Sequence, residues 1–169
     1  MRMILSRLHF PVTTLGPGRR IGLWFQGCSI RCAGCISRDT WETGEGEVEV
    51  AEVIAELGRF AGEADGLTVS GGEPFDQPQA LTLVLAAWRE MSKRPVLVFT
   101  GRERAEVDEW LAANSWLVDA LVTGPFRSDL PQTMALRGSD NQDLHILSPA
   151  GEALRAFERH ATSADRRLD

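Results

Sequence analysis

The three cysteines of this 169-residue chain lie close together, at positions 28, 32 and 35, and the sequence contains no others. Thiolates are soft ligands that suit zinc and iron–sulfur centres. Three of them on one loop can hold a metal centre and leave one position without a protein ligand. A structural site avoids an open position, whereas a catalytic site needs one. The spacing therefore predicts a catalytic metal centre held by Cys28, Cys32 and Cys35.

Three interpretations of this cysteine group are open. A structural zinc ion would need a fourth ligand, which His9, His145 or an acidic residue could supply, but the chain has no second cysteine pair. The thiols could instead be buried and inert. Three cysteines within eight residues beside Arg31 disfavour this second interpretation. The third interpretation is a [4Fe–4S] cluster with three protein thiolates and one open iron.

The elements that must position the cysteines alternate along the chain. Apolar runs of strand length alternate with helical periodicity, which predicts a parallel sheet with covering helices. Four or five such units are too few for a closed eightfold barrel, which takes about 250 residues. We therefore expect an α/β fold, a partial, open β/α barrel with a mostly parallel sheet. The expected strands are 3–9, 21–26, 66–70, 95–100, 120–123 and 144–147, and the expected helices are 50–62, 79–92, 103–113 and 151–160, with 13–20 as a turn and 44–49 as a loop.

Three chemically unusual loops follow expected strands. The cysteine loop follows 21–26, the sequence Ser-Gly-Gly-Glu-Pro follows at 70–74, and Thr100-Gly101 ends a third strand. Ligands of parallel α/β sheets bind at the carboxyl ends of the strands. We therefore expect these loops to share one edge of the sheet and to form a single site.

Composition narrows the class of protein. A net charge of -6 argues against nucleic acid as a partner, because phosphate binding requires a basic face. The longest apolar run, 81–88, is far shorter than the roughly 20 residues of a membrane span, and Arg7 and His9 spoil a signal peptide. An odd number of cysteines, all clustered, does not suit a set of disulfides and fits a reducing compartment. We expect a cytoplasmic protein with one domain over 1–160 and a frayed, disordered tail over 161–169.

The cysteine spacing CxxxCxxC resembles the signature of the radical S-adenosylmethionine (SAM) superfamily. Further segments, in order from about residue 8 to 147, are similar to the glycyl-radical-enzyme activating enzymes. Within these, they resemble the activating proteins of the anaerobic (class III) ribonucleoside-triphosphate reductases. The segments are 15–19, 23–28 and 34–41 around the cysteines, 69–74 as the glycine-rich SAM motif, and the later 99–101, 119–130 and 136–142.

The resemblance implies two cofactors, a [4Fe–4S] cluster with one open iron and SAM. In the family the open iron chelates the amino and carboxylate groups of SAM, and one electron from the reduced cluster breaks a carbon–sulfur bond. The 5′-deoxyadenosyl radical that is released abstracts a hydrogen atom. The protein would position the cofactors and exclude water, while the cofactors supply the radical chemistry.

The resemblance also implies site residues. The peptide at Gly34 would contact the adenine, Ser70, Gly71 and Gly72 would let the backbone approach a ligand, and Glu73 would help to bind the SAM ammonium. Alone, the two glycines would be read as an ordinary turn. Five further residues have two possible roles, either binding the SAM carboxylate or ribose or stabilising local turns: Thr100, Gly101, Arg137, Asn141 and Gln142.

An open partial barrel leaves its cluster-bearing face available to something large. Together with this openness, the resemblance implies a glycine on a large glycyl-radical reductase subunit as substrate, with reduced flavodoxin or ferredoxin as electron donor. We expect neither nucleic acid nor membrane as a partner. One alternative is a small radical SAM enzyme that modifies a peptide or a metabolite. Another is a non-catalytic iron–sulfur or zinc-binding module.

Overall fold

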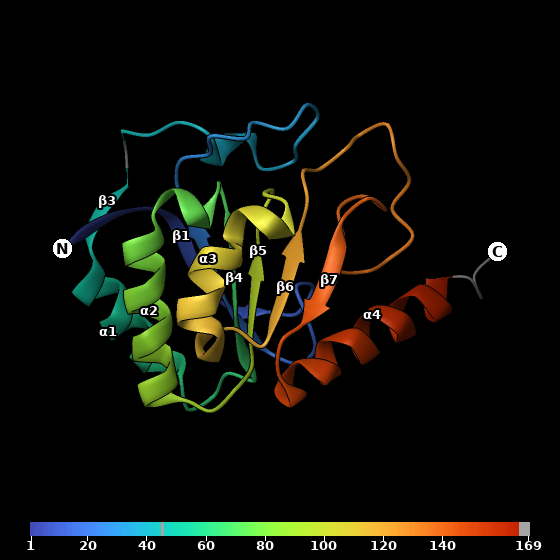
Figure 1. The fold of residues 1–169 in the computed structure, drawn as a ribbon. Helices are drawn as coiled ribbons and strands as arrows, with labels where there is room; N and C mark the ends of the chain where they lie inside the picture. The colour runs from blue at the N-terminus through green and yellow to red at the C-terminus, as the bar shows by residue number, and fades with distance from the viewer. Residues whose placement is uncertain (45, 166–169) are drawn as a thin grey trace.

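The computed structural model describes residues 1–44 and 46–165, with side chains as far as Arg159. Seven strands form one sheet (Figure 1). They are β1 (Arg2–Val12), β2 (Arg20–Phe25), β3 (Glu47–Glu49), β4 (Gly66–Gly71), β5 (Val96–Phe99), β6 (Ala120–Thr123) and β7 (Asp143–Ile146).

The order of strands across the sheet is β3-β1-β2-β4-β5-β6-β7. The four neighbours β2, β4, β5 and β6 run parallel to one another. At the flanks, β1 is antiparallel to both β2 and β3, and β7 is antiparallel to β6. The sheet is open, with β3 and β7 as its two edges, which confirms the expected α/β fold with an open sheet and a parallel centre.

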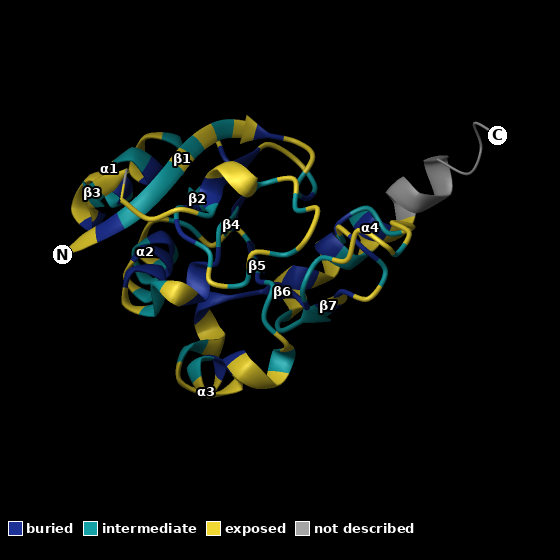
Figure 2. Ribbon diagram, turned by 90° about the horizontal axis from the view of Figure 1, so that it is seen from above, coloured by how far each residue is buried: buried dark blue, intermediate teal, exposed yellow. Residues whose placement is uncertain are grey.

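Helices cover both faces of the sheet unequally (Figure 2). α1 (Val50–Phe60), α2 (Pro78–Met91) and α3 (Arg104–Asn114) pack on one face, whereas α4 (Glu152–Asp165) lies against β6 and β7 on the other. Side chains alternate between faces along a strand. In β5, Val96 and Val98 accordingly join the core of the first three helices, and Leu97 joins the smaller core that contains Leu154.

α2 shows how the sequence packs a helix against the sheet. Its buried side chains recur at helical spacing and face the sheet: Leu81, Val84, Leu85 and Trp88 are all fully buried. Burying one such side chain stabilises the fold by about 1.5–3 kcal/mol. The central strands are therefore held firmly where their carboxyl ends present loops.

Arg20 secures the opposite, amino-terminal end of the parallel strands. It is fully buried at the start of β2 and donates to the Thr68 hydroxyl at 2.7 Å and to the carbonyls of Leu67 and Pro95 at 2.8 and 2.9 Å. Burial lowers the pKa of Arg20 to about 10. These bonds link β2, β4 and the start of β5.

Two elements differ from the sequence-based expectation. Residues 47–49, expected as loop, form β3 and pair with Arg2–Ile4, because three residues are too few to carry a periodic signal. α4 continues to Asp165 instead of ending at 160, since 161–165 contain neither glycine nor proline to stop it. The remainder of the expected tail, 166–169, lies outside the described residues. None of the helices in the described part of the chain is long and apolar enough to cross a membrane.

Candidate cofactor site

The loops after β2, β4 and β5 lie together at the carboxyl edge of the parallel strands, at the top of Figure 1. We call this edge the rim. The Glu73 N–H donates to the Gly27 carbonyl at 2.8 Å, which joins the loop after β4 to the start of the cysteine loop. The Gly101 N–H donates to the Glu73 carboxylate at 2.9 Å, which joins it to the loop after β5. These contacts confirm that the three loops share one edge.

The cysteine loop, residues 28–43, is closed at its base by backbone hydrogen bonds. The Gly27 N–H donates to the Thr40 carbonyl at 2.8 Å, and the Cys28 N–H donates to the Trp41 carbonyl at 3.0 Å. The base is thus fixed to the end of β2, and the three cysteines lie on the segment that projects from it.

All three thiols are free and half-buried. Burial raises the pKa of the Cys32 thiol; the Phe126 backbone N–H opposes this, and neighbouring Cys35 and Cys28 reinforce it. Within residues 1–44 and 46–165, no three His, Cys, Asp or Glu side chains are gathered tightly enough to hold a single metal ion. In a cubane each thiolate binds a different iron, so its sulfurs need not converge on one point.

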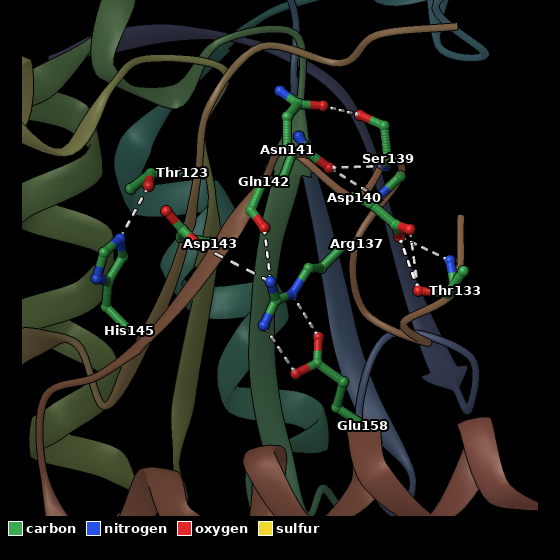
Figure 3. Close-up of polar contacts among 11 residues, drawn as sticks. Thr123, Thr133, Arg137, Ser139, Asp140, Asn141, Gln142, Asp143, His145 and Glu158 are labelled. Carbon is green, nitrogen blue, oxygen red and sulfur yellow. Dashed lines mark hydrogen bonds and ion pairs between the residues drawn. The ribbon is translucent and has the colours of Figure 1, made fainter. Parts of the chain in front are cut away.

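The two histidines considered as zinc ligands lie on strands outside the cysteine loop. His9 is exposed on β1. His145 lies on β7, where its Nε2 hydrogen-bonds the Thr123 hydroxyl at 2.9 Å (Figure 3), and burial lowers its pKa. The donor set on the cysteine loop is thus three thiols, which fits an iron–sulfur cluster with an open iron better than a four-ligand zinc ion.

Close backbone packing explains two of the glycines in the predicted site. A Cβ on Gly72 would lie 2.0 Å from the Gly27 carbonyl oxygen and 2.8 Å from that of Thr40. Gly34 has φ +78°, and a Cβ there would lie 2.7 Å from the Ser128 Cβ. Each glycine therefore lets one rim loop pack on another, while its contact with SAM stays a prediction. Ser70 and Gly71 end β4, side by side with the end of β2.

Glu73 is fully buried, and its carboxylate is surrounded by donors. One oxygen accepts from the Phe75 N–H at 3.0 Å and the Thr100 hydroxyl at 2.8 Å, and the other accepts from the Gly101 N–H at 2.9 Å. Burial raises the pKa of Glu73, and these hydrogen bonds and the Arg102 charge oppose the rise. Glu73, Thr100 and Gly101 thus form one unit that joins β4 to β5. Contact of Glu73 with the SAM ammonium stays a prediction.

Sequence reasoning missed Asp76 and Gln77, which lie two and three residues beyond Ser-Gly-Gly-Glu-Pro. The Gln77 side chain accepts from the Ile4 N–H at 2.8 Å and donates to the Ile4 and Gln26 carbonyls at 2.9 and 3.0 Å. It therefore joins β1 and β2 to the loop after β4. Asp76 reaches the cysteine loop itself. Two hydrogen-bonding side chains shortly after the glycine motif were a usable signal.

Arg137 lies in the long segment between β6 and β7, where its guanidinium faces Glu158 (Figure 3). Its Nε donates to the buried Glu158 carboxylate of α4 at 2.9 Å, and its Nη1 donates to the Gln142 carbonyl at 2.8 Å. The guanidinium is thus engaged in linking this segment to α4, and its predicted contact with SAM stays a prediction.

Asn141 and Gln142 shape the same segment. Asn141 accepts from the Ser139 hydroxyl at 2.7 Å and donates to the Pro125 carbonyl at 2.8 Å. Gln142 accepts from the Gly138 N–H at 2.7 Å and donates to the Gly124 carbonyl at 2.8 Å. Both side chains satisfy neighbouring backbone groups here, and their roles in binding the cofactor also stay predictions.

Comparison with known proteins agrees with this site. Residues 14–145 match the family model described as a 4Fe-4S single cluster domain. The anaerobic ribonucleoside-triphosphate reductase-activating protein of Salmonella typhimurium is 34% identical over 151 residues, which cover 82% of this chain and 96% of that protein. The pyruvate formate-lyase-activating enzyme of Clostridium pasteurianum is 36% identical over 97 residues, or 52% of this chain and 40% of that enzyme.

Among solved structures, QueE from Escherichia coli is similar in fold, with a TM-score of 0.50 and 20% identity over 59% of this chain and 53% of that one. This likeness concerns the fold alone. The matches in sequence span the cysteine loop and the glycine-rich loop after β4, in the order found along the chain. The chain therefore belongs to the radical SAM family of activating enzymes that includes the anaerobic ribonucleoside-triphosphate reductase-activating proteins, whose cofactors are a [4Fe–4S] cluster and SAM.

Proposed function

We propose that this chain is an activase that generates a glycyl radical on an anaerobic ribonucleoside-triphosphate reductase. The observation that carries the proposal is the similarity to the reductase-activating protein of Salmonella typhimurium, which extends over 96% of that protein. The family model matches residues 14–145, which include the rim loops, the segment after β6 and the start of β7. It therefore concerns the whole site and not the cysteine motif alone.

In this proposal Cys28, Cys32 and Cys35 each bind one iron, and the fourth iron is left for SAM. The bound cluster and SAM would together supply the one-electron radical chemistry that removes a hydrogen atom from a glycine of the partner. The protein's part is positional. The Glu73 carboxylate holds the loops after β4 and β5 together through Thr100 and Gly101.

The open sheet supports a protein as the substrate. β3 and β7 are free edges of a sheet that does not close on itself, and Gly34 of the cysteine loop is exposed. A segment of a large partner can therefore reach the rim, where a closed barrel would restrict access. We propose reduced flavodoxin or ferredoxin as electron donor and the cytoplasm as location, where the three free thiols are kept reduced.

Radical formation on the partner tests this function. The full chain is reconstituted anaerobically with iron and sulfide and mixed with SAM, dithionite and the cognate reductase. We expect about four irons per chain, SAM cleavage to 5′-deoxyadenosine, and a glycyl radical signal by electron paramagnetic resonance. Flavodoxin or ferredoxin with its own reductase should replace dithionite.

Two results would decide against the proposal. SAM cleavage without any glycyl radical would favour an enzyme that acts on a peptide or a metabolite. A single zinc per chain, with no SAM cleavage, would favour a non-catalytic module. A variant of the reductase in which the glycine proposed to carry the radical is replaced provides the control for the radical signal.

A further inference from the structure

We propose that Asp76 is a positioning residue that fixes the cysteine loop relative to the loops that bind SAM. The inference rests on the proposed function, because it takes the cysteines as cluster ligands. Asp76 ends the short helical turn Pro74–Asp76 that follows β4, immediately after the glycine-rich motif. Its side chain is only 23% exposed.

Asp76 binds the cysteine loop through Ser29, the neighbour of Cys28. One carboxylate oxygen accepts from the Ser29 N–H at 2.7 Å, and the other accepts from the Ser29 hydroxyl at 2.8 Å. A carboxylate that receives both the backbone and the side-chain donor of one residue fixes that residue in position and orientation, and hydrogen bonds to an ionised acceptor are the stronger kind.

The same carboxylate also reaches the loop after β5. The Arg102 guanidinium donates to Asp76 Oδ1 at 2.7 Å. Arg102 in turn accepts, at its carbonyl, the Gly124 N–H at 2.8 Å, and Gly124 directly follows β6. The contacts from Ser29 through Asp76 and Arg102 to Gly124 therefore run across the ends of β2, β4, β5 and β6, the four parallel strands, in their order in the sheet.

The segment that carries the cysteines makes few other polar contacts with the rest of the described chain. From residue 29 to 37, the polar links to other segments of the described chain are the two Ser29 bonds and the Phe126 N–H at the Cys32 sulfur. The remaining bonds close within the loop, as from the Cys35 N–H to the Cys32 carbonyl. Removing the Asp76 carboxylate would thus release the ligand-bearing segment while the base stays closed.

The first test uses the cluster-free protein, so it does not depend on activity. Asp76→Ala should stay folded with a lowered melting temperature, because three hydrogen bonds are lost, and should speed hydrogen exchange of the amides in residues 28–37 by about tenfold. Asp108→Ala is the matched control, because Asp108 is a 56% exposed carboxylate on α3 that also pairs with an arginine. It should leave exchange in the cysteine loop unchanged.

The second test uses the reconstituted protein. SAM is titrated against the reduced cluster while the electron paramagnetic resonance spectrum is recorded. We expect Asp76→Ala to bind iron at the wild-type ratio but to need about tenfold more SAM for half of the spectral change. Asp76→Asn keeps one acceptor and should be intermediate. Ser29→Ala keeps its N–H bond and should need about twofold more SAM.

Unchanged loop exchange and an unchanged SAM midpoint in Asp76→Ala would overturn the inference. If Asp76→Ala does not fold, Ser29→Ala decides in its place, and wild-type behaviour of that variant overturns the inference equally. Failure of the wild-type protein to cleave SAM would instead contradict the proposed function, and the exchange result on the cluster-free protein would still stand.

Discussion

The cysteine loop and the loop after β4 lie side by side at the rim but are built in opposite ways. The cysteines are half-buried and free, and few hydrogen bonds join residues 29–37 to other segments of the described chain. Glu73 and Gly72, in contrast, are enclosed by backbone groups of neighbouring loops. The first loop carries the proposed ligands, and the second is packed to hold that loop in position. Substitutions should therefore separate loss of chemistry from loss of stability.

The largest expected effect is on chemistry alone. Replacing Cys28, Cys32 or Cys35 singly by serine should reduce SAM cleavage by more than about 100-fold, since loss of a ligand exceeds the effect of losing an outer-shell partner. The melting temperature of the cluster-free protein should stay the same, because the thiols are half-buried and contribute little packing. Iron analysis and the cleavage assay measure the loss.

Ile36→Ser is the control for the cysteine variants, since Ile36 follows Cys35 and is 98% exposed. It should retain the iron of the wild-type protein. A cysteine variant with full iron content and full SAM cleavage would contradict the assignment of that residue as a ligand.

Arg137 extends the comparison to the segment after β6. Arg137→Ala would remove the guanidinium that contacts the Glu158 carboxylate, which is 2% exposed. The free energy of unfolding of the cluster-free protein should fall by about 3 kcal/mol in a urea titration, as for a broken buried ion pair. Arg155→Ala removes an exposed ion pair with Glu152 on α4, the helix that carries Glu158. This variant should lower the free energy of unfolding by less than about 1 kcal/mol.

Unchanged stability of Arg137→Ala, combined with a higher SAM requirement, would restore the sequence-based role of Arg137 in cofactor binding. Loss of stability with an unchanged SAM requirement would assign it to the link with α4.

Gly72 tests the close contact between the two rim loops. Gly72→Ala would place a Cβ 2.0 Å from the Gly27 carbonyl oxygen, so the free energy of unfolding should fall by about 1–3 kcal/mol, the usual cost of overpacking. Gly62→Ala provides the control, because a Cβ there meets no atom within 4 Å. Equal stability of the two variants in urea would show that the loops separate without cost.

The smallest effect is the pH dependence that Glu73 adds. Burial raises the pKa of Glu73 in the folded state above the ordinary 4.5 of the unfolded state. At pH values between the unfolded-state pKa and the raised folded-state pKa, the folded state therefore binds more protons than the unfolded state. The contribution of Glu73 to stability is then present below pH 4.5 and is lost as pH rises through the raised pKa.

The free energy of unfolding of wild type minus that of Glu73→Gln should therefore decrease as pH rises through this window, with a slope of at most about 1.4 kcal/mol per pH unit. Urea titrations at several pH values measure the difference. A difference that grows with pH would mean that the donors around Glu73 outweigh its burial.

Much of the fold was predictable because its signals are local. The apolar run at 66–70 and the periodicity at 79–92 each fall within one or two residues of β4 and α2. β3 was missed because its three residues form a strand only by pairing with β1. The antiparallel direction of β7 also depends on pairing, since its four residues have no direction of their own.

The sequence by itself predicted the cysteine ligand set and determined the order of elements and the family, because cysteine spacing and the glycine-rich motif are properties of short segments. Tertiary structure decided which polar groups face one another. It places Glu73 among three donors of two loops, engages Arg137 with Glu158, and brings Asp76 to Ser29, which is 47 residues away in sequence. Such contacts depend on how the strands order themselves in the sheet, and local residue patterns do not encode that order.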